Sequence, residues 1–267
     1  LQTAPANPPI GAHGVAGAMP AAVMPAAVPL GTGPASQVKM EGSILVASGR
    51  PLFPRLIQYQ GEPLTFLKQL GFNGIWLAQT PTAELVQEAD RQGLWIVSPP
   101  PIPPTPPADA SSAAIGAGFQ RVLAWDIGSR LTGEQVEATR QWAELVRAAD
   151  RRNGRPLICR PENELWSYSH FANPLVIGRS PVGTSLEMAD YGTWVRERPR
   201  LARPGTPVWT SVQTQPAATL REQWAILGRG EAPPGAVANE QLRLLVYTAI
   251  TAGSRGLIFE SDSRLDL

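Results

Sequence analysis

Two carboxylates of this sequence stand where short apolar runs end. Asp126 closes the run Val122–Asp126, and Glu260 closes the run Gly256–Glu260. A carboxyl group in such a place can exchange a proton with a bound ligand, because its surroundings adjust its pKa. Further acidic residues follow other runs of the same kind, namely Glu62, Glu162 and Asp262.

Eight such runs, each followed by a polar loop and usually by a helical stretch, predict the fold that holds these residues. Eight units in about 210 residues match a (β/α)8 TIM barrel, an α/β fold in which the chemistry lies on the residues that end each strand. The predicted strands are Leu52–Gln58, Gly74–Ala78, Leu94–Val97, Val122–Asp126, Pro156–Arg160, Leu175–Gly178, Pro207–Gln213 and Gly256–Glu260. The predicted helices are Pro63–Leu70, Thr82–Gln92, Thr132–Arg152, Glu162–His170, Ser185–Arg198, Leu220–Leu227 and Asn239–Ala252.

The chain divides into three regions. Residues 1–37 consist of Ala, Pro, Gly and Val with almost no charge, which predicts an extended tail or linker. Residues 38–50 predict a β-hairpin with turns at Gly42 and Gly49, and residues 51–267 form the predicted barrel. The chain starts with Leu, as a secreted protein without its signal peptide would, so we expect an extracytoplasmic or secreted location; proteolysis would give the same start.

The eighth helix of the barrel is missing from this sequence. Only Ser261–Leu267 follow the eighth predicted strand. The outer face of that strand would then expose apolar side chains, which soluble monomers rarely tolerate. We therefore expect further polypeptide, or a neighbouring subunit, to cover the eighth strand.

Composition excludes several classes of function. Lys and Arg (23) nearly balance Asp and Glu (22), so we expect no nucleic-acid partner. The only histidines are His13 and His170, which leaves no His-based metal site or catalytic triad, and we expect neither a metal nor a cofactor. Cys159 lies in an apolar run and predicts a buried, inert thiol. No run is long enough to span a membrane.

Residues 42–130 resemble part of a known enzyme superfamily. The segment Gly42–Pro63, with its Gly-Arg-Pro-Leu-Phe turn, is similar to the hairpin that leads into strand one of glycoside hydrolase barrels of the β-galactosidase and cellulase superfamily. Leu67–Leu77, which reads Leu-Lys-Gln-Leu-Gly-Phe-Asn-Gly-Ile-Trp-Leu, resembles helix one and strand two of these barrels, and Glu88–Val97 resembles the approach to strand three. The resemblance implies a TIM barrel with carbohydrate as its ligand.

The resemblance also implies a retaining mechanism, with one carboxylate ending strand four and one ending strand seven. The sequence departs from this pattern at both places. Asp126 stands in strand four where the superfamily has Asn-Glu, and Gln213 stands in strand seven where the nucleophile is expected. An amide cannot replace that nucleophile, so we expect retaining hydrolysis to be weak or lost.

Asp126 and Glu260 are the remaining candidates for a catalytic pair. Strands four and eight lie on opposite sides of a barrel, which suits the spacing of roughly 6.5–9.5 Å of an inverting enzyme better than the shorter retaining one. Alternatively, both are hydrogen-bonded rim residues paired with Arg160 or Arg179. Glu62 precedes a predicted helix, where capping would explain it fully.

Other rim residues are candidates for contact with a sugar. Tyr59 and Trp166 are the two proposed aromatic platforms, because most tryptophans fall inside strand or helix runs and predict core packing. Arg179 lies in the segment Gly178–Ser185, which could cradle an anion or simply lead into a helix cap. The remaining candidates for substrate contact are Glu62, Gln79, Arg160 and Gln213.

Two functions therefore remain open. The first is a glycoside-hydrolase-like barrel that binds or cleaves carbohydrate, with weakened or lost retaining activity. The second is a non-catalytic structural or interaction module within a larger protein assembly.

Overall fold

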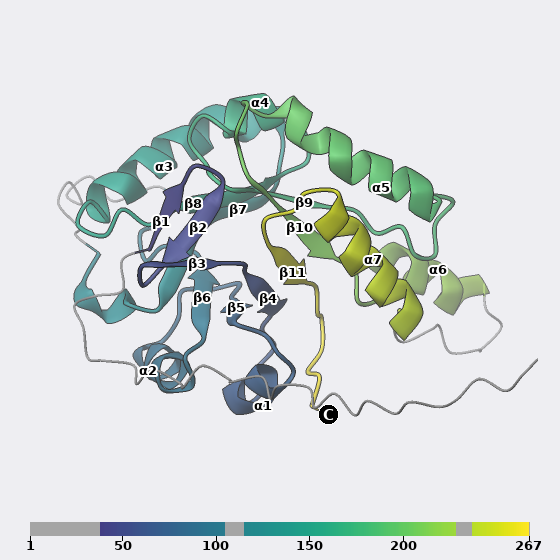
Figure 1. Ribbon diagram of the computed structural model, residues 1–267, viewed down its shortest axis with the longest axis horizontal. Helices are drawn as coiled ribbons and strands as arrows, with labels where there is room; N and C mark the ends of the chain where they lie inside the picture. Colours follow the sequence, from purple (N-terminus) through teal and green to yellow (C-terminus); the bar gives the residue numbers. More distant parts are fainter. Residues whose placement is uncertain (1–37, 105–114, 228–236, 267) are drawn as a thin grey trace, which may run out of the picture. The chain divides into compact units, whose positions relative to one another are not determined.

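The computed structural model describes residues 38–104, 115–227 and 237–266. The predicted tail, residues 1–37, lies outside the described residues. Within them, eight parallel strands close into a barrel in the order β10-β11-β4-β5-β6-β7-β8-β9 (Figure 1). The predicted TIM barrel is confirmed. Its strands are β4 (Arg55–Gln58), β5 (Gly74–Trp76), β6 (Trp95–Ser98), β7 (Val122–Leu131), β8 (Leu157–Pro161), β9 (Leu175–Gly178), β10 (Val208–Val212) and β11 (Leu257–Phe259).

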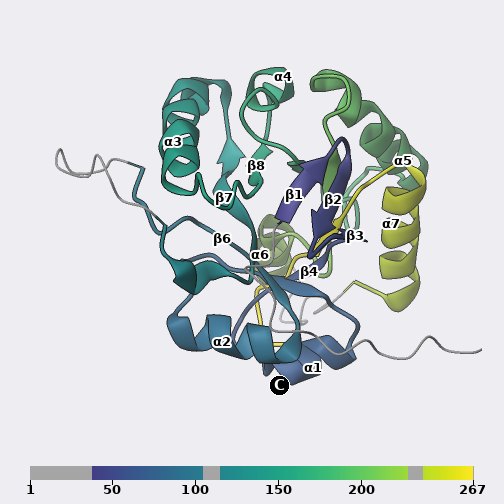
Figure 2. The same cartoon turned by 60° about the vertical axis from the view of Figure 1, so that its left-hand side comes forward.

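Helices connect these strands on the outside of the barrel, as Figure 2 shows. Along the described part of the chain, no helix follows β11. This agrees with the expected absence of the eighth helix. The α-helices are α1 (Leu64–Gln69), α2 (Ala83–Gln92), α3 (Val136–Ala149), α4 (Leu165–Tyr168), α5 (Met188–Glu197), α6 (Ala218–Leu227) and α7 (Asn239–Thr251). The 3₁₀ turns are η1 (Ala117–Phe119), η2 (Gly133–Gln135) and η3 (Arg198–Leu201).

A small antiparallel sheet precedes the barrel. It contains β1 (Val38–Glu41), β2 (Ile44–Ala47) and β3 (Arg50–Leu52), so the predicted hairpin has a third strand. Gly42 and Gly49 occupy its two turns with φ of 60° and 75°, a region that favours glycine. The predicted strand Leu52–Gln58 is split, because Leu52 belongs to this sheet and the first barrel strand begins only at Arg55.

The interior of the barrel is filled by alternate residues of its strands, as the two-residue period of a strand requires. Indoles supply much of this volume. Glycine occurs at two positions where a side chain would collide with a tryptophan ring or with the backbone of a tryptophan. A Cβ on Gly256 would lie 2.9 Å from the ring of Trp209, and a Cβ on Gly74 would lie 2.8 Å from the carbonyl oxygen of Trp95. Side chains of the small sheet join the same cluster. The cluster contains Val38, Leu45, Ala47, Leu56, Trp76, Trp95, Val97, Leu123, Ala124, Ile158, Val176, Trp209 and Ile258.

A buried polar cluster joins β7 to the segment that follows α3. Asp150 accepts a hydrogen bond from Trp125 Nε1 at 2.9 Å and pairs with Arg155 at 2.6 Å. Arg155 also donates to the carbonyl oxygen of Phe119 at 2.8 Å. The two charged side chains are only 3% and 5% exposed, so each depends on the other for compensation of its charge.

We predict that Asp150→Ala lowers the free energy of unfolding by about 3–5 kcal/mol, because it leaves the Arg155 guanidinium buried without its counter-charge. Urea denaturation followed by circular dichroism measures this loss. The matched control is Glu137→Ala, which breaks an ion pair with Arg140 whose side chains are 58% and 51% exposed and should cost about 1 kcal/mol or less. Equal losses in the two variants would contradict the prediction.

Candidate functional site

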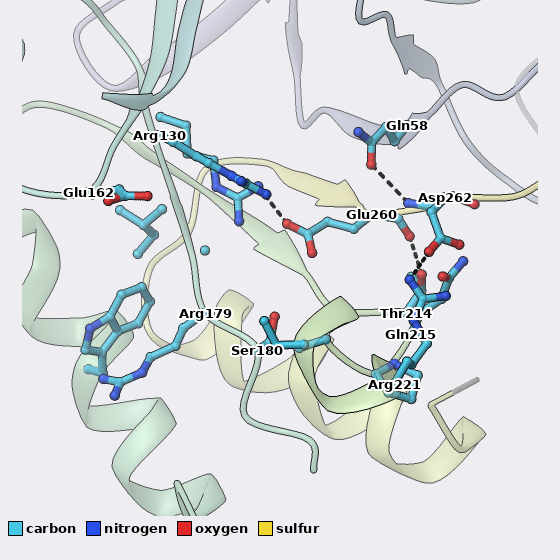
Figure 3. A pocket seen from close by; sticks show the side chains of 18 of the residues that line it. Gln58, Arg130, Glu162, Arg179, Ser180, Thr214, Gln215, Arg221, Glu260 and Asp262 are labelled. Atoms are coloured by element: carbon cyan, nitrogen blue, oxygen red, sulfur yellow. Dashed lines mark hydrogen bonds and ion pairs between the residues drawn. The ribbon is translucent and has the colours of Figure 1, made fainter. Parts of the chain in front are cut away.

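A cleft of about 840 Å³ opens at the rim formed by the carboxyl ends of the barrel strands. Figure 3 shows Glu162 and Arg179 on one side of it and Asp262 and Arg221 on the other, with Glu260 between them. This is the rim at which TIM barrels place their sites. The charged residues of its lining are Arg130, Arg160, Glu162, Arg179, Arg198, Arg221, Glu260 and Asp262.

The centre of the cleft is an ion pair across the barrel mouth. Arg160 of β8 lies 2.6 Å from Glu260, which follows β11. Glu260 also accepts a hydrogen bond from the hydroxyl of Ser211 on β10, at 2.6 Å. The Arg160 and Glu260 side chains are about one-third exposed, at 34% and 32%. Glu260 is therefore paired with Arg160, one of the two arginine partners considered for it.

Glycine at position 178 makes this ion pair feasible. Between β8 and β11 lie β9 and β10, so the guanidinium of Arg160 must pass the end of β9. Gly178 ends β9, and a Cβ there would run into the Arg160 guanidinium and lie 2.8 Å from Cβ of Ser211. Any larger residue would push Arg160 away from Glu260.

Asp126 lies within a strand and not at its end. Strand β7 continues five residues beyond it to Leu131, with an irregular register against β8, so the predicted strand end at this position was wrong. Its carboxylate is buried and accepts hydrogen bonds from Trp76 Nε1 at 3.2 Å and from the Gly128 amide at 3.0 Å. Burial raises the pKa of Asp126 to about 6, although these two hydrogen bonds and the charge of Arg160 favour the ionised form.

A cavity of about 50 Å³ is lined by residues of the barrel mouth. Trp76, Arg160 and Glu260 belong to its lining, so it adjoins both the hydrogen-bond partner of Asp126 and the central ion pair. Asp126 itself is absent from the lining of both the cleft and this cavity. The two predicted catalytic residues thus lie near one arginine but do not face a common cleft.

Gln213, the residue at the expected nucleophile position, holds a loop in place. Its amide oxygen accepts a hydrogen bond from Val182 N at 2.9 Å. Its amide nitrogen donates to the carbonyl oxygens of Val182 at 3.1 Å and Gln215 at 2.8 Å. The side chain is buried, and these bonds fix the segment after β9 to the end of β10. It does not line the cleft.

Glu62 does not cap the helix that follows it, so that interpretation was wrong. The residue at the start of α1 is Pro63, without a side-chain capping bond. The buried Glu62 carboxylate instead accepts hydrogen bonds from the amides of Gln60 at 2.9 Å and Leu265 at 3.2 Å. Glu62 therefore ties the loop after β4 to the segment after β11.

Three other predicted contact residues do not line the cleft. Trp166 is 54% exposed on α4 and packs edge to face against His170. Tyr59 is partly buried and packs against the larger of the two hydrophobic clusters. Gln79 is exposed in the loop after β5. Of the predicted contact residues, the structure brings only Arg160 and Arg179 to the cleft, together with the predicted catalytic residue Glu260.

Sequence reasoning missed the aromatic ring and several charges of the cleft. Trp194 of α5 lines it, although its place in a helical run predicted core packing. The guanidinium carbons of Arg179 and Arg198 lie 5.8 Å and 4.9 Å from the centre of its ring. Arg130 has φ of +57°, a conformation that non-glycine residues rarely adopt and that concentrates at functional sites. The only signal for it in the sequence is Gly128, which marks an irregular strand end.

Two further features are absent from the described residues. These residues contain no group of three or more His, Cys, Asp or Glu residues arranged to hold a metal ion. None of the helices described has the length and apolar character needed to cross a membrane.

Neither a protein-family model nor a curated protein matches this sequence. Solved structures do match. The fold is similar to that of a putative β-galactosidase from Bacteroides fragilis, with a TM-score of 0.59 and 13% identity over 84% of this chain and 38% of that chain. It is also similar to the β-D-glucuronidase of Dictyoglomus thermophilum, with a TM-score of 0.56 and 13% identity over 84% of this chain and 46% of that chain.

A β-glucuronidase from Ruminococcus gnavus gives a TM-score of 0.53 at 12% identity, over 86% of this chain and 47% of that chain. The chain thus spans less than half the length of each of these three enzymes. The fold is therefore a TIM barrel similar to the barrels of these enzymes, which is the fold that the sequence resemblance implied. At these identities the comparison establishes the fold.

The pKa of Asp126 leads to a prediction about stability. The pKa rises from an ordinary value of 3.8 to about 6 in the folded protein, so the folded state holds this proton more tightly than the unfolded state. The contribution of this tighter proton binding to the free energy of unfolding is fully present below pH 3.8 and is lost as the pH rises through 6. The unfolding free energy of the wild type minus that of Asp126→Asn should therefore fall by about 2 kcal/mol between pH 4 and pH 7.

Urea denaturation at intervals of half a pH unit tests this prediction. Glu84→Gln is the control with the opposite sign, because hydrogen bonds to its own backbone amide and to Thr82 lower the pKa of the exposed Glu84. For that variant, the unfolding free energy of the wild type minus that of Glu84→Gln should rise with pH. A flat or rising difference for Asp126→Asn would contradict the burial of an ionisable carboxylate.

Proposed function

We propose that this barrel binds carbohydrate in the cleft at its carboxyl-end rim. The observation that carries the proposal is the cleft itself, whose volume of about 840 Å³ is within the range of small-molecule sites. It presents ion-paired and hydroxyl groups around Glu260 that can form hydrogen bonds with the hydroxyl groups of a sugar. The similarity of the fold to glycoside hydrolases supports a sugar as the ligand.

We also propose that the cleft does not carry out retaining hydrolysis. That reaction needs two carboxylates about 5 Å apart, one of which attacks the sugar. Glu260 is engaged by Arg160 and Ser211, which stabilise its negative charge and reduce its nucleophilicity. The amide of Gln213 is committed to the backbone of Val182 and Gln215.

The second carboxylate is also out of reach. Asp126 is buried, and the cavity of about 50 Å³ near its partner Trp76 has room for water but not for a sugar ring. Although its raised pKa would suit a proton donor, the Asp126 carboxyl group therefore has no substrate within reach to protonate. Binding without retaining turnover is the function that this geometry supports best.

Glu260→Gln should weaken binding of neutral oligosaccharides about tenfold, because it removes a charged hydrogen-bond acceptor from the cleft and releases Arg160. Isothermal titration calorimetry against a panel of gluco-, galacto-, manno- and xylo-oligosaccharides measures the effect. The matched control is Glu222→Gln on α6, where an exposed glutamate lies outside the cleft lining and the affinity should not change.

The same panel as aryl glycosides tests the lack of turnover. We expect no release of the aryl group by the wild type above that of Glu260→Gln. Product with retained anomeric configuration, abolished by Asp126→Asn or Glu260→Gln, would contradict the proposed lack of retaining chemistry. Failure of every oligosaccharide to bind would contradict the proposed binding function.

A second candidate function rests on an apolar stripe of α7. Leu244, Tyr247 and Ile250 recur every three residues and are 48%, 65% and 43% exposed. Helix α7 lies beside α5 in Figure 2, and the stripe has no cover from the described part of the chain. Such a stripe is typical of a surface that packs on another protein, as expected of an interaction module.

For this candidate we expect the chain to self-associate through α7. Sedimentation velocity of the full chain should show concentration-dependent association that the double variant Leu244→Lys/Tyr247→Lys abolishes. Leu201→Lys, at a side chain 52% exposed on η3, is the control and should leave association unchanged. A wild type that sediments as a monomer at every concentration would rule out self-association through the stripe.

A further inference from the structure

The lining of the cleft carries more positive than negative charge. It contains five arginines and three acidic residues, an excess of two positive charges (5 − 3 = 2). Two of the acids are already used, because Glu260 pairs with Arg160 and Asp262 pairs with Arg221. Three guanidinium groups and the single carboxylate of Glu162 remain without an ion pair among the described residues; the three are Arg130, Arg179 and Arg198.

Two of these arginines form a defined pair. Arg179 follows β9, and Arg198 begins η3 directly after α5. Both guanidinium groups lie over the indole of Trp194, at 5.8 Å and 4.9 Å from its ring centre. Cation–π contact holds each group in place without neutralising it.

The pair carries an electrostatic cost that a ligand would relieve. Burial and then the charge of Arg179 lower the pKa of Arg198, as expected for two like charges that lie close together. A bound anion between them would remove this repulsion. Guanidinium groups suit this role, because their planar donor geometry matches the oxygens of a carboxylate or sulfate.

We infer that the cleft takes an anionic glycan, a sugar that carries a carboxylate or sulfate group, and that Arg179 and Arg198 hold this group over Trp194. The inference rests on the proposed carbohydrate binding and adds the charge of the ligand. The neutral part of the sugar then lies toward Glu260 and Arg160.

The experiment compares acidic ligands with neutral counterparts by calorimetry on the full chain. One arm uses trigalacturonate and its methyl ester, and the other uses a sulfated galactose disaccharide and its desulfated form. We expect at least one acidic ligand to bind tenfold or more tightly than its neutral counterpart. The arm that shows the preference identifies the anion as carboxylate or sulfate. Added NaCl should weaken only the acidic ligand.

Arg179→Gln/Arg198→Gln should abolish the preference, so that the acidic ligand and its neutral counterpart bind with equal affinity. Arg200→Gln is the matched control, since Arg200 is exposed on η3 and does not line the cleft. The single variant Arg179→Gln, at an exposed side chain, tests the same idea without disturbing the half-buried Arg198 and should lower the preference several-fold.

The outcomes separate this inference from the proposed function. If neutral sugars bind and neither acidic ligand is preferred, the inference is overturned and carbohydrate binding stands. A preference that persists in the double variant, or that Arg200→Gln removes equally, also overturns it. If no sugar binds at all, the proposed function fails and the inference fails with it.

Discussion

The mouth of this barrel depends on the ion pair between Arg160 and Glu260. It joins β8 to the end of β11 across two intervening strands, and it lies over the barrel interior. The pair neutralises the charge of Glu260, so the unpaired charges of the cleft lining belong to other residues. It also lies close enough to Asp126 for the arginine charge to favour that carboxylate's ionised form.

This ion pair depends in turn on how the barrel is filled. Large indoles occupy the interior. Gly256 leaves room for the indole of Trp209, and Gly74 lets its strand approach the backbone of Trp95. Gly178 continues this pattern at the rim, where the missing side chain is replaced by the Arg160 guanidinium. Close packing below the rim leaves few alternative positions for the side chains above it. The packed barrel interior therefore fixes the strand ends that carry the polar groups of the mouth.

The fold could be predicted from the sequence because its signals are local. Each strand is a short apolar run, and eight runs of regular spacing specify the barrel. Glycine and threonine also marked real helix ends: Thr82 accepts the capping bond at the start of α2, and Gly93 ends that helix in the left-handed conformation. Such features act over four or five residues, and the local amino-acid sequence alone reveals them.

The site could be predicted only in part, because its geometry depends on distant contacts. The irregular register of β7 against β8 moves the strand end from Asp126 to Leu131 and presents Arg130 at the rim. Arg198 and Trp194 reach the cleft only because of how α5 lies against the barrel. The hydrogen bond between Glu62 and Leu265 spans about 200 residues of sequence. Nothing local to these residues signals such contacts.

The seam between the first and last barrel strands has a consequence for folding. Strands β4 and β11 pair directly, with Leu56 opposite Ile258, although the chain between them contains nearly all of the barrel. Two hydrogen bonds stabilise the same seam: Gln60 donates to the carbonyl oxygen of Ser261, and Glu62 accepts from the amide of Leu265. Contacts of such long sequence separation form slowly, since closing a long loop costs entropy before any contact compensates for it. Gln58 and Glu260 lie on either side of the seam and both line the cleft, so the cleft is complete only when the ring closes. A partly folded chain would have most of the strands but no complete cleft.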